Sequence, residues 1–304
     1  MDESDTTPFV ASFCVLLGLT VIGFAVVWHH IVAVETQQRG LPVTVAVFTP
    51  INKILVLGFT GLLGLYSSQI AHNLFSVSTC FGKAASIVLQ FSIGLCEWAC
   101  LQYTWNRTKP ILLLVSPERV GPMKWAVRLS PGLFFSQVVT ALMLAIATTV
   151  DKPNPQPFDS LNNLFIGIAG ITATLLDTVF LVTFIRFLRT KHTALPSDQL
   201  KLFQTVARYG CWTAAALYVC SIMAPRIMFL ISPAFIGVSF WILFEMKRAI
   251  WKIATDVGVA SDYEGTTNVA VGELESGVIV PDKCNTSISD VEGGSVIRGS
   301  ISDD

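Results

Sequence analysis

Two acidic residues, Glu97 and Asp177, lie inside long apolar stretches of the chain. A carboxylate at the centre of a bilayer costs at least about 2.5 to 3.5 kcal/mol, so both side chains are expected to face the interior of a helical bundle. Counting from the middle of each stretch puts the two acids at depths that differ by about 3 Å. Such a pair suits the binding of a cation or a proton, coupled to a conformational change. The alternative is that each acid is neutral and forms only structural hydrogen bonds.

Small and polar residues share the predicted helical faces that carry these acids, as expected where membrane helices pack closely. They are Ser86, Gln90 and Gly94 beside Glu97, and Gly167, Gly170 and Thr174 beside Asp177. No Lys or Arg is expected at the same depth, so at least one carboxyl group is predicted to be protonated.

A second polar group is predicted nearer the outer ends of the apolar stretches. Gln69, Gln90 and Tyr218 fall at comparable depth there and are candidates for lining a small-ligand pocket. His72 and Asn73 are interpreted as neighbours of the lipid headgroups. Pro233 removes a backbone donor within the last stretch, and we expect it to kink that helix and to act as a candidate hinge.

The composition indicates what must position these residues. The chain has 304 residues, of which 52% are hydrophobic and 13% charged, and its mean hydropathy is +0.62. A soluble domain carries about 25% charged residues, so a bilayer is the expected surroundings. The net charge of −1 gives no indication of a nucleic-acid partner.

Seven apolar stretches have the length of about 20 residues that a membrane-spanning helix needs. They are residues 9–31, 54–75, 84–103, 131–150, 164–188, 202–224 and 227–246. Of the Lys and Arg residues between them, 15 fall on one side and three, Lys83, Lys152 and Arg226, on the other. Because basic residues resist translocation, the N-terminus is predicted outside and the C-terminus in the cytosol. The predicted fold is therefore an all-α polytopic membrane protein, a bundle of seven transmembrane helices.

This topology divides the chain into four parts. Residues 1–8 form a short extracellular N-terminus, and residues 9–246 form the transmembrane domain. Residues 247–255 are predicted either to lie on the inner membrane surface as an amphipathic helix or to be the end of the seventh helix. Residues 256–304 are rich in Gly, Ser, Thr and acidic residues, and we expect a disordered cytosolic tail.

The inner loops and the tail are the expected contacts for cytosolic partners. Loops 104–130 and 189–201 on the inner side are candidate sites for a transducer protein. In the tail, a repeated Ser-Ile-Ser-Asp sequence suits an acid-directed kinase. The candidate phosphorylation sites are Ser287, Ser289, Ser300 and Ser302.

Catalytic chemistry is not indicated. The four histidines do not form the set of a membrane metal enzyme, and no phosphate loop, nucleophile elbow or paired-aspartate motif is present in the sequence. We therefore expect no enzyme activity, no cofactor and no metal centre.

Seven helices, an outer N-terminus, long basic inner loops and a Ser/Thr-rich tail resemble the architecture of G-protein-coupled receptors. The resemblance is confined to topology, because Cys80 has no cysteine partner in residues 151–163 and the last stretch lacks an Asn-Pro-x-x-Tyr element. It implies a receptor-like protein of the plasma membrane that senses a small ligand and couples to a cytosolic transducer. The alternatives are a proton- or cation-coupled transporter or channel that uses Glu97 and Asp177, and a membrane scaffold without a ligand.

Overall fold

The computed structural model describes residues 3–39, 42, 49–75, 79–149, 156–191, 197–222 and 225–256, and this part of the chain is almost entirely helical. Its elements, in order, are α1 (Glu3–His29), η1 (His30–Glu35), α2 (Thr36–Arg39), α4 (Pro50–Leu74), α5 (Cys80–Val115), α6 (Pro117–Phe134), α7 (Ser136–Thr149), α8 (Gln156–Lys191), α9 (Ser197–Ile222) and α10 (Pro225–Asp256). The phosphorylation candidates Ser287, Ser289, Ser300 and Ser302 lie outside the described residues.

Threonine residues begin two of the central helices. The Thr49 side chain accepts a hydrogen bond from the backbone N–H of Asn52 at 3.4 Å, and Pro50 follows as the first residue of α4. Thr79 caps α5 in the same way, accepting from the N–H of Gly82 at 3.0 Å. A capping hydroxyl satisfies an amide that has no partner within the helix, so these residues fix where α4 and α5 start.

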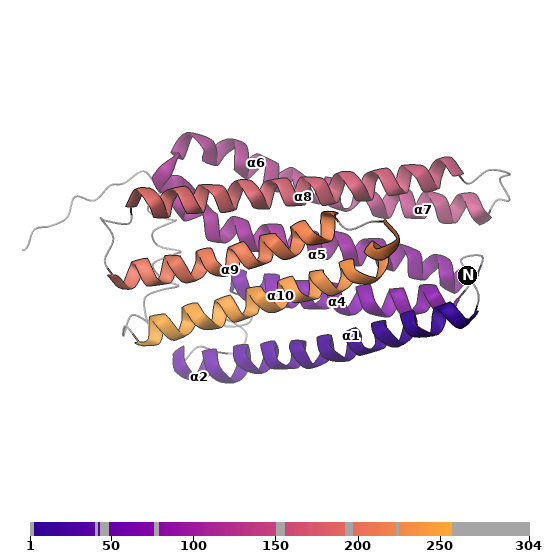
Figure 1. Cartoon of the computed structure of the whole chain (residues 1–304), viewed down its shortest axis with the longest axis horizontal. Coiled ribbons are helices and arrows are strands. Elements are labelled where there is room, and N and C mark those ends of the chain that lie inside the picture. The colour runs from indigo at the N-terminus through magenta and orange to yellow at the C-terminus, as the bar shows by residue number, and fades with distance from the viewer. Residues whose placement is uncertain are drawn as a thin grey trace, which may run out of the picture.

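The long helices lie side by side along the longest axis of the molecule (Figure 1). Helix α5 is central: it packs along α4 and also contacts α6, α7 and α8. Helix α9 joins α8 to α10, and α10 in turn packs on α4 and α1, which closes the bundle. Helix α4 lies especially close to α5, since a Cβ atom at Gly64 would be 2.4 Å from Ser92 Oγ.

The outward surfaces of the helices are apolar. On α8, Leu164, Ile168, Ile171 and Leu175 are exposed, whereas Phe180 and Phe184 are buried against the bundle. This division into an exposed apolar face and a buried face is what a lipid environment requires, because water would not tolerate so much contiguous apolar surface.

Five helical segments in the described part are long and apolar enough to cross a membrane, as in a multi-pass membrane protein. They are Pro8–Glu35, Pro50–Leu74, Cys80–Lys109, Pro117–Thr149 and Ser160–Phe187, which overlap the first five predicted spans. The sixth and seventh predicted spans correspond to α9 and α10, helices of 26 and 32 residues whose side chains at residues 217–232 lie outside the described part.

Helical structure extends beyond the predicted spans. The predicted inner loop 104–130 is helical except at Ser116, where α5 has ended and α6 begins with Pro117. Charged residues such as Arg and Lys are good helix formers, so a helix can continue after it has left the apolar layer. Residues 247–255 continue α10 without interruption. In the second predicted inner loop, residues 192–196 lie outside the described part.

Candidate functional site

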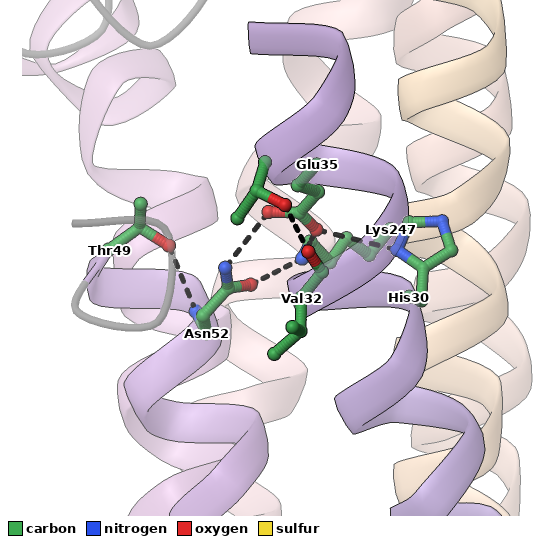
Figure 2. Close-up of polar contacts among 7 residues, drawn as sticks. His30, Val32, Glu35, Thr49, Asn52 and Lys247 are labelled. Carbon is green, nitrogen blue, oxygen red and sulfur yellow. Dashed lines mark hydrogen bonds and ion pairs between the residues drawn. The ribbon is translucent and has the colours of Figure 1, made fainter. Parts of the chain in front are cut away.

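Four polar side chains meet where η1, the first turn of α4 and the last part of α10 converge (Figure 2). We call His30, Glu35, Asn52 and Lys247 the Glu35 cluster. The Lys247 ammonium group contacts Glu35 Oε1 and Asn52 Oδ1, and Asn52 Nδ2 donates to Glu35 Oε2 at 2.9 Å. His30 Nδ1 lies 3.5 Å from Glu35 Oε1. Three side chains from three helices therefore form a closed ring of contacts.

The Glu35 cluster is buried. Glu35 is 1% exposed and Asn52 0% exposed, and the Lys247 side chain is 11% exposed. Glu35 ends a π-helical turn, a local widening of the helix that is found frequently at functional sites. A charge removed from water is tolerated only when it is paired and hydrogen-bonded, so this ring connects α1, α4 and α10 strongly.

The Glu35 cluster was not predicted from the sequence. Glu35 lies just beyond predicted span 9–31, and Lys247 was counted only among the basic residues that set the orientation. One feature of the sequence could have indicated it: Glu35 is the acidic residue of the predicted inner segment 32–53, whose other charged residues, Arg39 and Lys53, are basic.

Asp177 lies between α8 and α5. The hydroxyl of Thr104 donates to Asp177 Oδ1 at 2.9 Å, and Asp177 is 8% exposed. Thr104 is seven residues beyond Glu97 on α5, which corresponds to about 10 Å along the helix axis. Asp177 is therefore level with Thr104, not with Glu97, and the expected depth match of the two acids is not present.

Arg107 is a basic neighbour of Asp177, although no Lys or Arg was predicted at the depth of this acid. It is close enough to Asp177 for an electrostatic interaction, and its guanidinium carbon lies 5.8 Å from the centre of the Phe184 ring. Its Nη1 atom is 3.7 Å from Met246 Sδ, and a Cβ atom at Gly210 would be 3.1 Å from the same nitrogen. Arg107 thus reaches from α5 to α8, α9 and α10.

Glu97 faces α7 rather than Asp177. Its side chain is near enough to the amide of Gln137 to interact with it. Glu97 Oε2 is nevertheless buried without a hydrogen-bond partner among the described residues.

Two of the candidates for an outer pocket are buried glutamines, Gln69 on α4 and Gln90 on α5. Gln69 and Gln90 are 6% and 7% exposed, and the side-chain oxygen of each has no hydrogen-bond partner in the described part of the chain. On α5, Ser92 and Cys96 contact α4, whereas Gln90 shares a helical face with Gly94, which approaches Phe134 and Gln137 instead. The described residues therefore do not bring Gln69 and Gln90 to one interface.

The remaining two candidates are on other helices. The Thr174 hydroxyl donates to the Gly170 carbonyl of its own helix at 2.9 Å. Tyr218 belongs to α9, and its side chain lies outside the described part.

Pro233, the candidate hinge, lies inside α10 and is buried. The Tyr66 hydroxyl of α4 donates to the Pro233 carbonyl oxygen at 2.6 Å. Helix α4 is therefore hydrogen-bonded to α10 at the proline.

No protein-family model, curated protein or solved structure matches this chain. Its function is therefore inferred from the arrangement of its own residues.

Proposed function

We propose that this chain is a receptor-like seven-transmembrane signalling protein of the plasma membrane, which senses a small ligand from outside and couples to a cytosolic transducer. In this proposal α9 and α10 are the sixth and seventh spans, and the Glu35 cluster lies at the cytosolic end of the bundle. The proposal rests on three features: the topology, the outer polar atoms, and the path that connects them to the Glu35 cluster.

The contact between Glu35 and Lys247 supports an odd number of spans. It puts the C-terminal parts of α1 and α10 at the same end of the bundle, so the two helices run in the same direction. If both cross the membrane, an odd number of crossings runs from α1 to α10. Seven crossings agree with the distribution of Lys and Arg, which assigns this end to the cytosol.

The buried side-chain oxygens of Gln69 and Gln90 support ligand binding at the outer end. A buried amide oxygen without a partner loses the hydrogen bonds that water would give it, at a cost of about 1 to 3 kcal/mol. A small ligand that carries hydrogen-bond donors would recover this energy. The same oxygens would then select a ligand with donors over a purely apolar one.

The hydrogen bond from Tyr66 to Pro233 is the observation that carries the proposal. Helix α4 bears Gln69 one turn from Tyr66, and its first turn bears Asn52, which contacts Lys247. Helix α10 bears both Pro233 and Lys247. A ligand that shifts α4 at Gln69 would therefore act on α10 at its proline and at its cytosolic end, where a transducer would bind. A shift of this kind needs two arrangements of the helices that bind the ligand unequally.

A ligand screen tests this function. The purified protein is first screened by thermal shift against small polar molecules, and each hit is then tested for recruitment of heterotrimeric G proteins in cell membranes. We expect a stabilising hit to promote recruitment in the wild type and to lose its effect in Gln69→Leu and Gln90→Leu. The matched control is Gln102→Leu, also on α5 but three turns nearer the cytosolic end, which should keep the response. Hits that stabilise both outer variants as strongly as the wild type would contradict the assignment of the pocket.

The orientation has its own test. Asn106 belongs to an Asn-Arg-Thr acceptor sequence that the proposed topology puts in the cytosol. We expect it to remain without glycan, whereas an acceptor sequence introduced within residues 151–163 should be glycosylated. If the wild-type chain, without the introduced acceptor, shows a glycosidase-sensitive mobility shift that disappears in Asn106→Gln, the proposed orientation is wrong.

A proton- or cation-coupled transporter or channel is the second candidate function. The unpaired carboxylate oxygen of Glu97 favours it, because a buried acid without a protein partner is typical of ion pathways. Cation- or pH-dependent flux in reconstituted vesicles that disappears in Glu97→Gln and Asp177→Asn would support this alternative over the receptor.

A further inference from the structure

The fourth candidate span, Pro117–Thr149, is interrupted in its middle. Helix α6 ends at Phe134 and α7 begins at Ser136, just after Pro131 and Gly132. The backbone N–H of Phe135 donates to the carbonyl oxygen of Pro131 at 2.9 Å. The Ser136 hydroxyl donates to the carbonyl oxygen of Leu133 at 2.6 Å. Interrupted membrane helices are a common source of ion sites, because their backbone carbonyls can point away from the helix axis.

Helix α5 approaches this interruption at Gly94. A Cβ atom at Gly94 would lie 2.9 Å from the Phe134 carbonyl oxygen and 3.2 Å from Gln137 Nε2. Only a residue without a side chain admits so close an approach. Glu97 follows one turn later on α5, and its carboxyl group is near the Gln137 amide.

The polar atoms at this point are buried and unpaired. Gln137 is 0% exposed, and neither of its amide atoms has a hydrogen-bond partner in the described part of the chain. The same holds for Glu97 Oε2. One turn further along α7, by contrast, the Thr140 hydroxyl donates to Asn162 Oδ1 at 2.7 Å. The two acceptors among these atoms, Gln137 Oε1 and Glu97 Oε2, are costly in an apolar interior unless a ligand satisfies them.

We propose that Glu97, Gln137 and the Phe134 carbonyl form a binding site for a monovalent metal cation, with Na⁺ as the expected ion. The three groups supply a carboxylate oxygen, an amide oxygen and a backbone oxygen, which are the ligands that hard cations prefer. One carboxylate balances one positive charge, whereas a divalent ion would leave an uncompensated charge in the membrane interior. The site lies between α5 and α7 and does not depend on the receptor proposal.

Cation-dependent stability tests this site. The full chain, purified in detergent, is melted while NaCl replaces choline chloride at constant ionic strength, with KCl, CaCl₂ and MgCl₂ in parallel. We expect a saturable rise in melting temperature with Na⁺, because an ion that binds only the folded state stabilises it. Glu97→Gln and Gln137→Leu should raise the half-saturating Na⁺ concentration by about tenfold or more.

Glu245→Gln is the matched control, since Glu245 is an acid that lies outside the site on α10, where it pairs with Arg248 at 3.7 Å. It should keep the wild-type response. Equal melting temperatures in NaCl and choline chloride would overturn the proposal, as would stabilisation by divalent ions alone. An unchanged Na⁺ response in Gln137→Leu would overturn it even if Glu97→Gln does not fold.

Discussion

The hydroxyl of Tyr66 donates a 2.6 Å hydrogen bond to the carbonyl oxygen of Pro233, and so joins the middle of α4 to the proline of α10. Tyr66 is 1% exposed. Room for the phenol comes from Gly237, one turn after the proline, where a Cβ atom would lie 2.6 Å from the Tyr66 oxygen. A proline has no N–H to donate to the preceding turn, so α10 lacks one backbone hydrogen bond there. Tyr66 therefore contacts the helix at the point where its own hydrogen bonding is interrupted.

The first prediction concerns this contact between helices. Tyr66→Phe should lower the free energy of unfolding by about 1 kcal/mol, the usual contribution of one hydrogen bond. Gly237→Ala should be destabilising in the wild type and less so in the Tyr66→Phe background, because the phenylalanine lacks the oxygen that the new methyl group would meet. A double-mutant cycle of melting temperatures measures this coupling. Equal effects of Gly237→Ala in both backgrounds would show that the two residues do not interact.

The second prediction concerns the Glu35 cluster. Lys247→Met should cost about 3 to 5 kcal/mol, since it leaves the carboxylate of Glu35 buried without its cation. The double variant Glu35→Leu/Lys247→Met should be more stable than Lys247→Met alone, because it removes both charges. Lys252→Met, an exposed lysine on the same helix, is the control and should change stability little. A double variant less stable than Lys247→Met would contradict this account, because it would show that Glu35 stabilises the protein even without its cation.

The third prediction concerns the packing of α4 on α10. A Cβ atom at Gly58 would lie 1.9 Å from the Phe240 ring, so Gly58→Ala should destabilise the protein by about 1 to 3 kcal/mol through overpacking. Gly167 on α8 has open space at its Cβ position, and Gly167→Ala should be neutral or stabilise the helix by up to about 1 kcal/mol. Thermal unfolding of the two variants should therefore shift in opposite directions, and a loss of stability in both would contradict the packing.

The fourth prediction concerns Asp177. Thr104→Val removes the donor to its carboxyl group, and we expect a cost of about 1 to 3 kcal/mol for the acceptor left unpaired in a buried position. Thr178 is adjacent to Asp177 but exposed, and its hydroxyl donates within α8 at 2.7 Å. Thr178→Val is therefore the control. Equal melting temperatures for the two valine variants would mean that the Thr104 hydrogen bond contributes nothing to stability.

Five of the predicted spans were recovered as helices with apolar exposed faces because hydropathy measures directly what a bilayer selects. The same measure is less decisive for α9, whose first half includes Gln204 and Arg208. Helix ends were also poorly predicted. Charge marks where a chain leaves the membrane, but it does not end a helix, so α5 runs on to Val115.

The candidate site was predicted in part. Burial of Gln69, Gln90 and Asp177 followed from their positions in apolar spans. The side chain that contacts each acid could not be predicted in this way. It depends on which helices are neighbours and on how far they are displaced from each other along the bundle axis. One such offset pairs Asp177 with Thr104, and another leaves Glu97 opposite Gln137. The Glu35 cluster was missed because it joins side chains from three helices, η1, α4 and α10, whose packing the sequence does not reveal.

Guanine-nucleotide exchange tests the proposed receptor-like function most directly, because breaking the Glu35 cluster should free the cytosolic part of α10, where a transducer would bind. Membranes that contain equal amounts of folded wild type, Lys247→Met, Glu35→Leu/Lys247→Met or Lys252→Met are assayed with a panel of heterotrimeric G proteins. We predict that both variants that break the Glu35 cluster raise ligand-independent exchange several-fold and that Lys252→Met matches the wild type. If exchange in both broken-cluster variants equals that of the wild type with every G protein, the receptor-like account is contradicted.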